Sequence, residues 1–306
     1  MKMIMTYHIT QEQKDMTVER YLLDQGYSRG LIRHLRNTEN GLTIDGKLVY
    51  TTHRLECGET LTALLKDEES SRHIVPTPMP LHIVYEDEHL LVINKDAGVP
   101  IHPSQGNFEH TLANGVAHYF KEKGESFVYR AINRLDRDTT GLLILAKNPL
   151  SACLLSDMVK RRDIHRRYLA IVCGKLPESG IIDKPIKRVE GSTIERCADQ
   201  TGEAARTHYK RLYYDPVTGH SLTGLRLETG RTHQIRVHLK SIGFPLPGDF
   251  LYHPDYRYIK RQALHSFRLD FYHPIKRVPL SFEAPLPKDM QFIGVTSTEG
   301  LWDSDF

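Results

Sequence analysis

The chain contains few cysteines and no long apolar segment. Only four of its 306 residues are cysteine, and no two of them form a C-x-x-C pair. This distribution argues against a disulfide framework and against a cysteine zinc site. Every apolar run is much shorter than the roughly 20 residues of a membrane helix, and the N-terminal stretch turns polar too early for a secretory signal. These absences predict a cytoplasmic protein without a membrane segment.

The sequence also lacks the motifs of the common cofactor sites. Its 17 histidines are dispersed, and the spacing of His233 and His238 does not align two side chains on one face of a helix. No P-loop, dinucleotide-binding or metal motif is present. The sequence therefore predicts a reaction without a metal or another cofactor. The net charge of +3 is mild and does not by itself indicate a nucleic-acid partner.

Residues 1–65 carry the pattern of a small α/β domain. Thr17 can cap a first short helix, and Ser28 can cap a second one. A hairpin centred on an Asp-Gly pair is expected at 42–49, because that pair lies between alternating apolar residues, and one further strand follows. The segment thus predicts two helices and a small sheet.

The second of these helices has a basic stripe. Its arginines, Arg29, Arg33 and Arg36, recur at spacings of four and three residues, which return to the same face of a helix. Arginine binds phosphate oxygens through its planar fork of donors, so the stripe can bind RNA phosphates. The alternative is the solvated face of an ordinary surface helix.

Residues 66–80 are acidic and then proline-rich, a composition that predicts a linker. The large domain is expected at 81–306. Its strand-like segments outnumber the helical ones and do not alternate with them regularly, so the expected class is α+β, with a mostly antiparallel mixed sheet and flanking helices. Strands are expected within 81–95, 142–146, 167–174, 208–214 and 223–228, and helices from 112, from 149 and from the cap residue Thr232.

The segment NRLDRDTTG (133–141) places two carboxylates and two arginines in a loop that enters an apolar strand. An arginine beside an aspartate favours the ionised carboxylate, which is the form that a nucleophile needs. A loop aspartate that accepts backbone hydrogen bonds is an equally good interpretation of this segment alone. Local chemistry does not distinguish Asp136 from Asp138.

A second segment that is rich in candidate functional residues is ETGRTHQIRVHLKSIGFPLPGD (228–249). Gly230 allows a tight turn, Arg231 lies at the expected start of the helix, and Arg236 and His238 follow on it. Taken alone, this segment also fits a basic surface helix.

Together the two segments resemble the signature of the RluA family of pseudouridine synthases, H-R-L-D-x-x-T-S-G followed by G-R-x-H-Q-I-R-V-H and G-x-P-I-x-G-D. Shorter matches extend the resemblance over 81–290, and 1–65 resembles the S-four-like RNA-binding domain, whose second helix and hairpin face RNA phosphates. The resemblance implies an isomerase that converts uridine to pseudouridine in RNA without a cofactor. The shorter matches lie at 84–98, 102–104, 166–174, 263–274 and 284–287.

The resemblance also implies roles for three residues. Asp136 corresponds to the nucleophile that detaches uracil from the ribose, by attack at C1′ or by another route. Arg231 corresponds to the arginine that pairs with this aspartate, and Tyr168 to the tyrosine that stacks on uracil and helps to remove the C5 proton. The chain departs from the family pattern at three positions outside this set, Asp96, Asn133 and Thr140.

A uridine inside a duplex is out of reach of an aspartate, so the target base must be unpaired or flipped out. Basic residues near the two motifs are expected to hold the flanking phosphates: Arg134, Arg137, Arg166, Arg167 and Arg236. The family resemblance together with the N-terminal module makes large-subunit ribosomal RNA the first expectation for the substrate, with transfer RNA as the second, and we expect a monomer. A catalytically inactive RNA-binding protein of the same fold and a carboxylate-dependent hydrolase are the rival interpretations.

Overall fold

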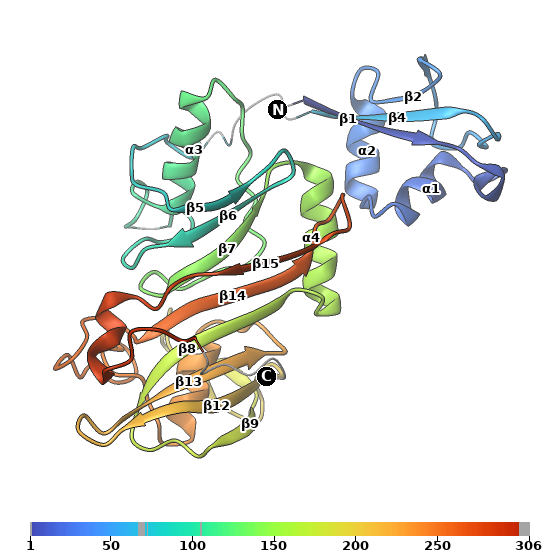
Figure 1. Cartoon of the computed structure of the whole chain (residues 1–306). Helices are drawn as coiled ribbons and strands as arrows, with labels where there is room; N and C mark the ends of the chain where they lie inside the picture. Colours follow the sequence, from blue (N-terminus) through green and yellow to red (C-terminus); the bar gives the residue numbers. More distant parts are fainter. Residues whose placement is uncertain (1, 67–70, 72, 105, 300–306) are drawn as a thin grey trace.

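The structure is a computed structural model, and it describes residues 2–66, 71, 73–104 and 106–299. A four-stranded sheet with two helices comes first in the chain, and a nine-stranded sheet with further helices follows. Figure 1 shows the small sheet at one end of the molecule, next to helix α4 (Pro149–Arg161). Leu150 of this helix belongs to the apolar core of the N-terminal module. The predicted fold class, α+β with a mostly antiparallel sheet, is confirmed.

The N-terminal module is built as its capping residues predict. The side chain of Thr17 accepts a hydrogen bond from the Arg20 amide, and that of Ser28 accepts one from the Leu31 amide. Its strands pair in the order β1-β4-β2-β3, all antiparallel. The elements are β1 (Lys2–His8), η1 (Gln11–Gln13), α1 (Val18–Asp24), α2 (Arg29–Asn37), β2 (Leu42–Ile44), β3 (Lys47–Leu48) and β4 (Thr60–Lys66).

Helix α2 presents one apolar face and one basic face. Leu31, Ile32 and Leu35 are buried in the core of the module. The three predicted arginines, Arg29, Arg33 and Arg36, are all exposed. The stripe is therefore open to a ligand.

The large sheet follows the order β5-β6-β7-β14-β8-β13-β12-β9, with β15 paired to β14. All pairs are antiparallel except β7 with β14. Its strands are β5 (Ile83–Glu86), β6 (Leu90–Lys95), β7 (Thr140–Ala146), β8 (His165–Cys173), β9 (Ser179–Asp183), β12 (Arg206–Asp215), β13 (His220–Leu227), β14 (Leu264–Tyr272) and β15 (Pro279–Glu283). The remaining elements are the hairpin β10 (Ile186–Arg188) and β11 (Arg196–Ala198), the helices α3 (Leu112–Glu122) and α5 (Gln234–Ser241), and η2 (Lys288–Ile293).

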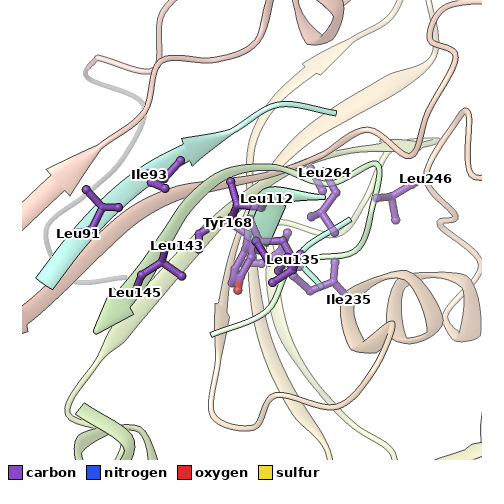
Figure 2. Packing of buried hydrophobic residues seen from close by; sticks show 14 of the residues in the cluster. Leu91, Ile93, Leu112, Leu135, Leu143, Leu145, Tyr168, Ile235, Leu246 and Leu264 are labelled. Carbon is purple, nitrogen blue, oxygen red and sulfur yellow. The ribbon is translucent and has the colours of Figure 1, made fainter. Parts of the chain in front are cut away.

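The central strands are apolar in consecutive positions because both faces of the sheet are covered. Alternate residues of β7 belong to different cores: Leu143 and Leu145 pack with α3 and α5, whereas Leu142 and Ile144 pack with α4. Figure 2 shows the first of these cores, in which Tyr168 of β8 lies near Leu135 and Ile235. The ring of Tyr168 is thus on the face that α3 and α5 cover.

Gly141 allows the loop before β7 to enter the sheet. Its φ of 109° is a conformation that L side chains rarely adopt, and a Cβ atom there would lie 2.2 Å from the carbonyl oxygen of Ser266 on β14. A glycine is therefore required where the parallel pair β7–β14 begins. This position ends the first predicted motif and fixes the direction in which Asp136 approaches the sheet.

Some expectations need correction or lie outside the described residues. Thr232 does not cap α5: the helix begins at Gln234, its N-cap is His233 with a left-handed φ of 57°, and no side chain caps it. Strand β1 was not predicted at all. Part of the predicted linker, 67–70 and 72, lies outside the described residues. Among the described residues, no helix is long and apolar enough to cross a membrane.

Candidate active site

The two sequence motifs meet at a hollow of about 600 Å³, which we call the site hollow. Its walls come from the loop before β7, from the start of β8 and from the turn that leads into α5. Asp136, Tyr168 and Arg236 all line it. Residues 100 positions apart in the sequence are thus brought to one cavity, of a size typical of small-molecule and nucleotide sites.

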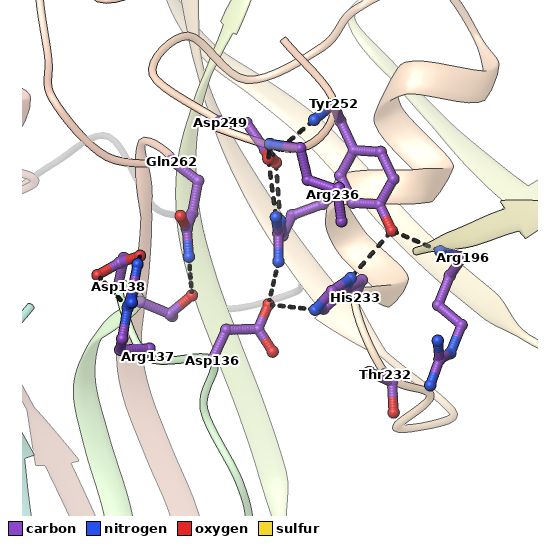
Figure 3. Close-up of polar contacts among 12 residues, drawn as sticks. Asp136, Arg137, Asp138, Arg196, Thr232, His233, Arg236, Asp249, Tyr252 and Gln262 are labelled. Carbon is purple, nitrogen blue, oxygen red and sulfur yellow. Dashed lines mark hydrogen bonds and ion pairs between the residues drawn. The ribbon is translucent and has the colours of Figure 1, made fainter. Parts of the chain in front are cut away.

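Asp136 is held by Arg236. Nη1 of Arg236 donates a hydrogen bond of 2.8 Å to Oδ2 of Asp136 (Figure 3). The Asp136 side chain is 28% exposed, whereas that of Arg236 is 1% exposed. The charged pair therefore lies at the floor of the hollow, with the arginine below and one carboxylate oxygen accessible from above.

The same arginine is anchored from behind by Asp249. Its Nε and Nη2 donate to the two oxygens of Asp249, both at 2.7 Å, in a bidentate pair. Asp249 also accepts from the amides of Leu251 and Tyr252 and is fully buried. Burial acts to lower the pKa of Arg236, but the hydrogen bonds and charges of Asp249 and Asp136 raise it above its usual range. One cation thus serves two carboxylates, which leaves the group with a net negative charge at Asp136.

The two arginines of the second motif, Arg231 and Arg236, have different partners. Arg231 does not contact Asp136; its guanidinium pairs with Glu203 and donates to the carbonyl of Ala204. Arg231 precedes α5 and faces the chain before β12, whereas Arg236 lies inside α5 and points to the core. Arg236 is therefore the partner of Asp136, and its buried guanidinium is not available to an RNA phosphate.

A histidine and a tyrosine form a second chain of contacts to Asp136. The hydroxyl of Tyr252 accepts a 2.9 Å hydrogen bond from the amide of Arg196 and lies 2.9 Å from Nδ1 of His233. The amide can only donate, so the hydroxyl proton is free to point at Nδ1. If the hydroxyl donates there, the neutral ring carries its proton on Nε2, and we predict this tautomer; Nε2 lies 3.9 Å from Oδ2 of Asp136 (Figure 3). Burial lowers the pKa of His233, with Arg236 acting in the same direction and Asp136 opposing it.

Tyr168 of β8 lies at the wall of the site hollow. It is 4% exposed, and it borders the site hollow at the start of β8. Burial raises its pKa, and the negative charge of Asp136 adds to the rise, while Arg166 acts in the opposite direction. The side chain is therefore a neutral phenol at the wall of the site hollow.

The loop 136–139 is fixed by three buried side chains outside the sequence motifs. Lys95 donates to the carbonyl of Arg137 at 2.8 Å, Arg261 donates to the carbonyl of Asp138 at 3.2 Å, and Gln262 donates to the hydroxyl of Thr139 at 3.2 Å. Burial lowers the pKa of Lys95 to about 7, because desolvation outweighs the nearby aspartates. These contacts hold the loop without using the carboxylate of Asp136, whose hydrogen bond comes from Arg236.

The two carboxylates of this loop face different ways. Asp138 pairs with the Arg137 guanidinium at 3.0 Å and does not line the site hollow. Figure 3 shows Asp136 directed at His233 and Asp138 on the other side of the loop. The structure thus distinguishes Asp136 from Asp138, which the local sequence alone does not.

The other arginines expected to bind RNA do not all lie on the same side of the sheet. Arg134 and Arg166 line the site hollow, and Arg137 is exposed outside it. Arg167 points to the opposite face of β8, where it pairs with Asp270 at 3.2 Å, so it does not share the site hollow with Arg166. Asn133, one of the departures from the family pattern, is buried and accepts from the Ile144 amide. The asparagine therefore supports the loop and β7.

Several site residues were missed by the sequence reasoning: Lys95, His233, Asp249, Tyr252 and Arg261. Asp249 and His233 do lie inside the quoted motifs, so their position was a signal. Asp249 pairs with Arg236 of the same segment and His233 contacts Tyr252, but residue spacing alone does not show that these side chains meet.

Comparison with known proteins identifies the same family along most of the chain. Residues 89–241 match the family model described as RNA pseudouridylate synthase. The uncharacterised RNA pseudouridine synthase YjbO of Bacillus subtilis (strain 168) is 39% identical over 277 residues, which cover 90% of this chain and 97% of that protein. Ribosomal large subunit pseudouridine synthase D of Nitrosomonas europaea is 36% identical over 88% of this chain and 82% of its own length. Among solved structures, human RNA pseudouridylate synthase domain containing 1 superposes with a TM-score of 0.57 and 27% identity, over 67% of this chain and 83% of that one.

Proposed function

Since the chain belongs to the RluA-like RNA pseudouridine synthases, isomerases that act on RNA, we propose that Asp136 is its nucleophile and that ribosomal RNA is its substrate. The observation that carries the first part is the hydrogen bond from Arg236 to Asp136 at the floor of the site hollow. It holds the carboxylate in one orientation through only one of its two oxygens.

The proposed reaction begins with attack of the free Asp136 oxygen on C1′ of the target uridine. The bond from C1′ to N1 breaks, and its electron pair leaves with uracil. The detached base turns, C5 forms the new bond to C1′, and the carboxylate of Asp136 is released. Loss of the C5 proton and protonation of N1 complete pseudouridine, so the atoms of substrate and product are the same.

Arg236 has the positioning role in this scheme, in place of Arg231. Its bidentate pair with Asp249 fixes the guanidinium plane, so the remaining N–H is directed at Asp136. The guanidinium also stabilises the carboxylate when it leaves C1′ in the second half of the reaction. A lysine could supply the charge but not the planar fork.

We assign Tyr168 to stacking on the uracil ring. Its raised pKa supports this, because a neutral ring stacks without placing a second anion beside Asp136. To accept the C5 proton, Tyr168 would first have to give its phenolic proton to another group. The Asp136 carboxylate released from C1′ is the acceptor available at that stage.

We further propose that residues 1–65 form an RNA-binding domain, 66–80 a linker and 81–306 the catalytic domain. The exposed arginines of α2 support phosphate binding by the first of these. Ribosomal RNA is favoured because the relatives of 36% identity are named as ribosomal large subunit enzymes. Transfer RNA is the second candidate substrate, and the monomeric state and cytoplasmic location stay predictions.

The test uses RNA tritiated at uridine C5 and isolated from cells that lack the protein. Incubation with the full chain should release tritium to water and should release no free uracil. Fractionation into ribosomal and transfer RNA before incubation then assigns the substrate. Release of free uracil would favour a hydrolase, and binding without any tritium release would favour the inactive RNA-binding protein.

A further inference from the structure

A second hollow lies across the loop 136–139 from the site hollow. It has a volume of about 430 Å³, and Arg137 and Asp138 line it. Asp136, their neighbour in the chain, lines the site hollow instead. Consecutive Cα atoms are only about 3.8 Å apart, so this short loop is a wall shared by the two hollows. Figure 3 shows the side chains of Asp136 and Asp138 on its opposite sides.

Two aromatic side chains form an open surface in the second hollow. Phe250 is 46% exposed and Tyr256 is 38% exposed. The guanidinium of Arg236 lies 5.6 Å from the ring centre of Phe250, so this ring also contacts the arginine that holds Asp136. Exposed aromatic rings gathered at a hollow indicate a binding surface. Their place next to Arg236 ties that surface to the reaction site.

Polar groups of the second hollow suit a nucleotide. Lys260 and Arg137 are exposed cations at its rim. Gln262 is 1% exposed, and its Oε1 has no hydrogen-bond partner among the described residues, although its Nε2 donates to Thr139. A buried acceptor without a donor is unusual in a folded protein. An N–H group on the edge of a base would provide that donor.

We propose that the second hollow binds a nucleotide adjacent to the target uridine, with its base on Phe250 and Tyr256 and its phosphate near Lys260. The inference rests on the proposed function, in which the site hollow receives the uridine. A flipped uridine leaves its neighbour without a stacking partner. Aromatic rings beside cations are the usual means of binding such unstacked nucleotides. An RNA chain that leaves the site hollow across the loop 136–139 reaches the second hollow on its other side.

The test compares three tyrosine variants of the full chain. Tyr256→Ala removes the ring, and Tyr256→Phe keeps it. Tyr213→Ala is the matched control, because Tyr213 is 39% exposed on β12 and lines neither hollow. Each variant is assayed for tritium release from the C5-tritiated RNA described above, at several RNA concentrations. The assay yields an apparent KM and a kcat for each.

Tyr256→Ala should raise the apparent KM about fivefold or more, which is the effect expected when a base loses its aromatic partner. Its kcat should stay within about twofold of the wild type, since the variant leaves the contacts of Asp136 intact. Tyr256→Phe and Tyr213→Ala should keep wild-type values. Lys260→Gln should reduce the slope of log affinity against log salt by about 0.7, which corresponds to one lost phosphate contact.

An unchanged apparent KM in Tyr256→Ala would overturn the proposal, as would an equal rise in Tyr213→Ala. A Tyr256→Ala variant whose only change is in self-association, measured by sedimentation, would show the hollow to be a contact between copies of the chain and would also overturn it. If the wild type itself releases no tritium, the proposed function fails, and this inference fails with it. Tritium release by the wild type with an unaffected Tyr256→Ala variant refutes the inference alone.

Discussion

Arg236 donates to Asp136 with one nitrogen and to Asp249 with the other two. The bidentate contact with Asp249 determines how the guanidinium plane lies, and the third contact transmits this orientation to Asp136. Asp249 is in turn held by two backbone amides. The carboxylate in the site hollow is therefore positioned by a buried, fully bonded chain of charges rather than by the surface arginine Arg231.

Arg236→Lys should lower kcat by about 100-fold or more, because a lysine cannot bind Asp249 with two nitrogens and Asp136 with a third. Arg231→Lys is the matched control from the same segment, and its rate should stay within about threefold of the wild type. Tritium release measures both. A dead Arg231→Lys enzyme beside an active Arg236→Lys enzyme would contradict the role assigned to Arg236.

Asp136→Asn should abolish turnover while leaving thermal stability and RNA affinity close to those of the wild type, since the amide is nearly isosteric but is not a nucleophile. Asp138→Asn should keep most of its activity, because Asp138 faces away from the site hollow and its exposed pair with Arg137 is worth roughly 1 kcal/mol or less. Pseudouridine formation on one RNA, with melting curves for both variants, gives the answer. The opposite ranking of the two variants would show that the wrong carboxylate was assigned.

The tautomer of His233 can be measured directly. In protein labelled with 15N at histidine, the imidazole signals missing from a His233→Gln variant identify this ring, and they should show a proton on Nε2 and none on Nδ1. Tyr252→Phe removes the hydroxyl that fixes this tautomer, so the ring should shift towards a mixture of forms. A proton on Nδ1 in the wild type would mean that Tyr252 accepts from His233 and does not donate to it.

Lys95 should give the stability of the chain a specific pH dependence. Its pKa is about 7 in the folded state, against a usual value of 10.5. Between these values the unfolded chain binds the extra proton, so this residue makes the free energy of unfolding rise with pH, by up to about 1.4 kcal/mol per unit. Below about pH 7 Lys95 is protonated in both states, and its contribution to the slope disappears.

Lys95→Met provides the comparison for that slope. The variant should be less stable where Lys95 is neutral in the fold, because the carbonyls of Asp96 and Arg137 lose their donor. Its stability should also change less between pH 7 and pH 10 than that of the wild type. Denaturant unfolding across this range measures the difference, and parallel curves for the two proteins would show that Lys95 stays charged in the fold.

The sequence predicts those parts of the structure whose causes are local. Thr17 and Ser28 cap their helices as expected, because the capping bond joins residues three apart. Strand β1 was missed, since it is stabilised by pairing with β4 across nearly sixty residues and not by a pattern of its own. Tertiary pairing of this kind leaves little trace in a single segment.

The contacts of the active site are even harder to predict from the sequence. The motif places two arginines near Asp136, but which one faces it depends on where α5 begins, because each residue turns a helix by about 100°. The expected cap at Thr232 set the start too early, and His233 in a left-handed conformation moved it to Gln234. Lys95 acts through a contact with a distant part of the chain, and Asp249 acts through its pair with Arg236 on the preceding helix. These contacts follow from the fold and cannot be predicted from spacing.

The last prediction concerns the arginine stripe of α2. Replacing Arg29, Arg33 and Arg36 together by glutamine should weaken RNA binding and make its dependence on salt less steep, because each lost phosphate contact lowers the slope of log affinity against log salt by about 0.7 to 0.9. The folded state should be unaffected, since all three side chains are exposed while the apolar face of the helix stays buried.

Arg20→Gln is the matched control: Arg20 is an exposed arginine on the neighbouring helix, where it pairs with Asp24 at 3.2 Å. Filter binding to the substrate RNA between 50 and 200 mM salt gives the salt slope of each variant, and over this range the loss of phosphate contacts changes the affinity measurably. An unchanged slope in the triple variant, or an equal change in Arg20→Gln, would mean that the stripe is a solvated helix face and that RNA is held by the catalytic domain alone.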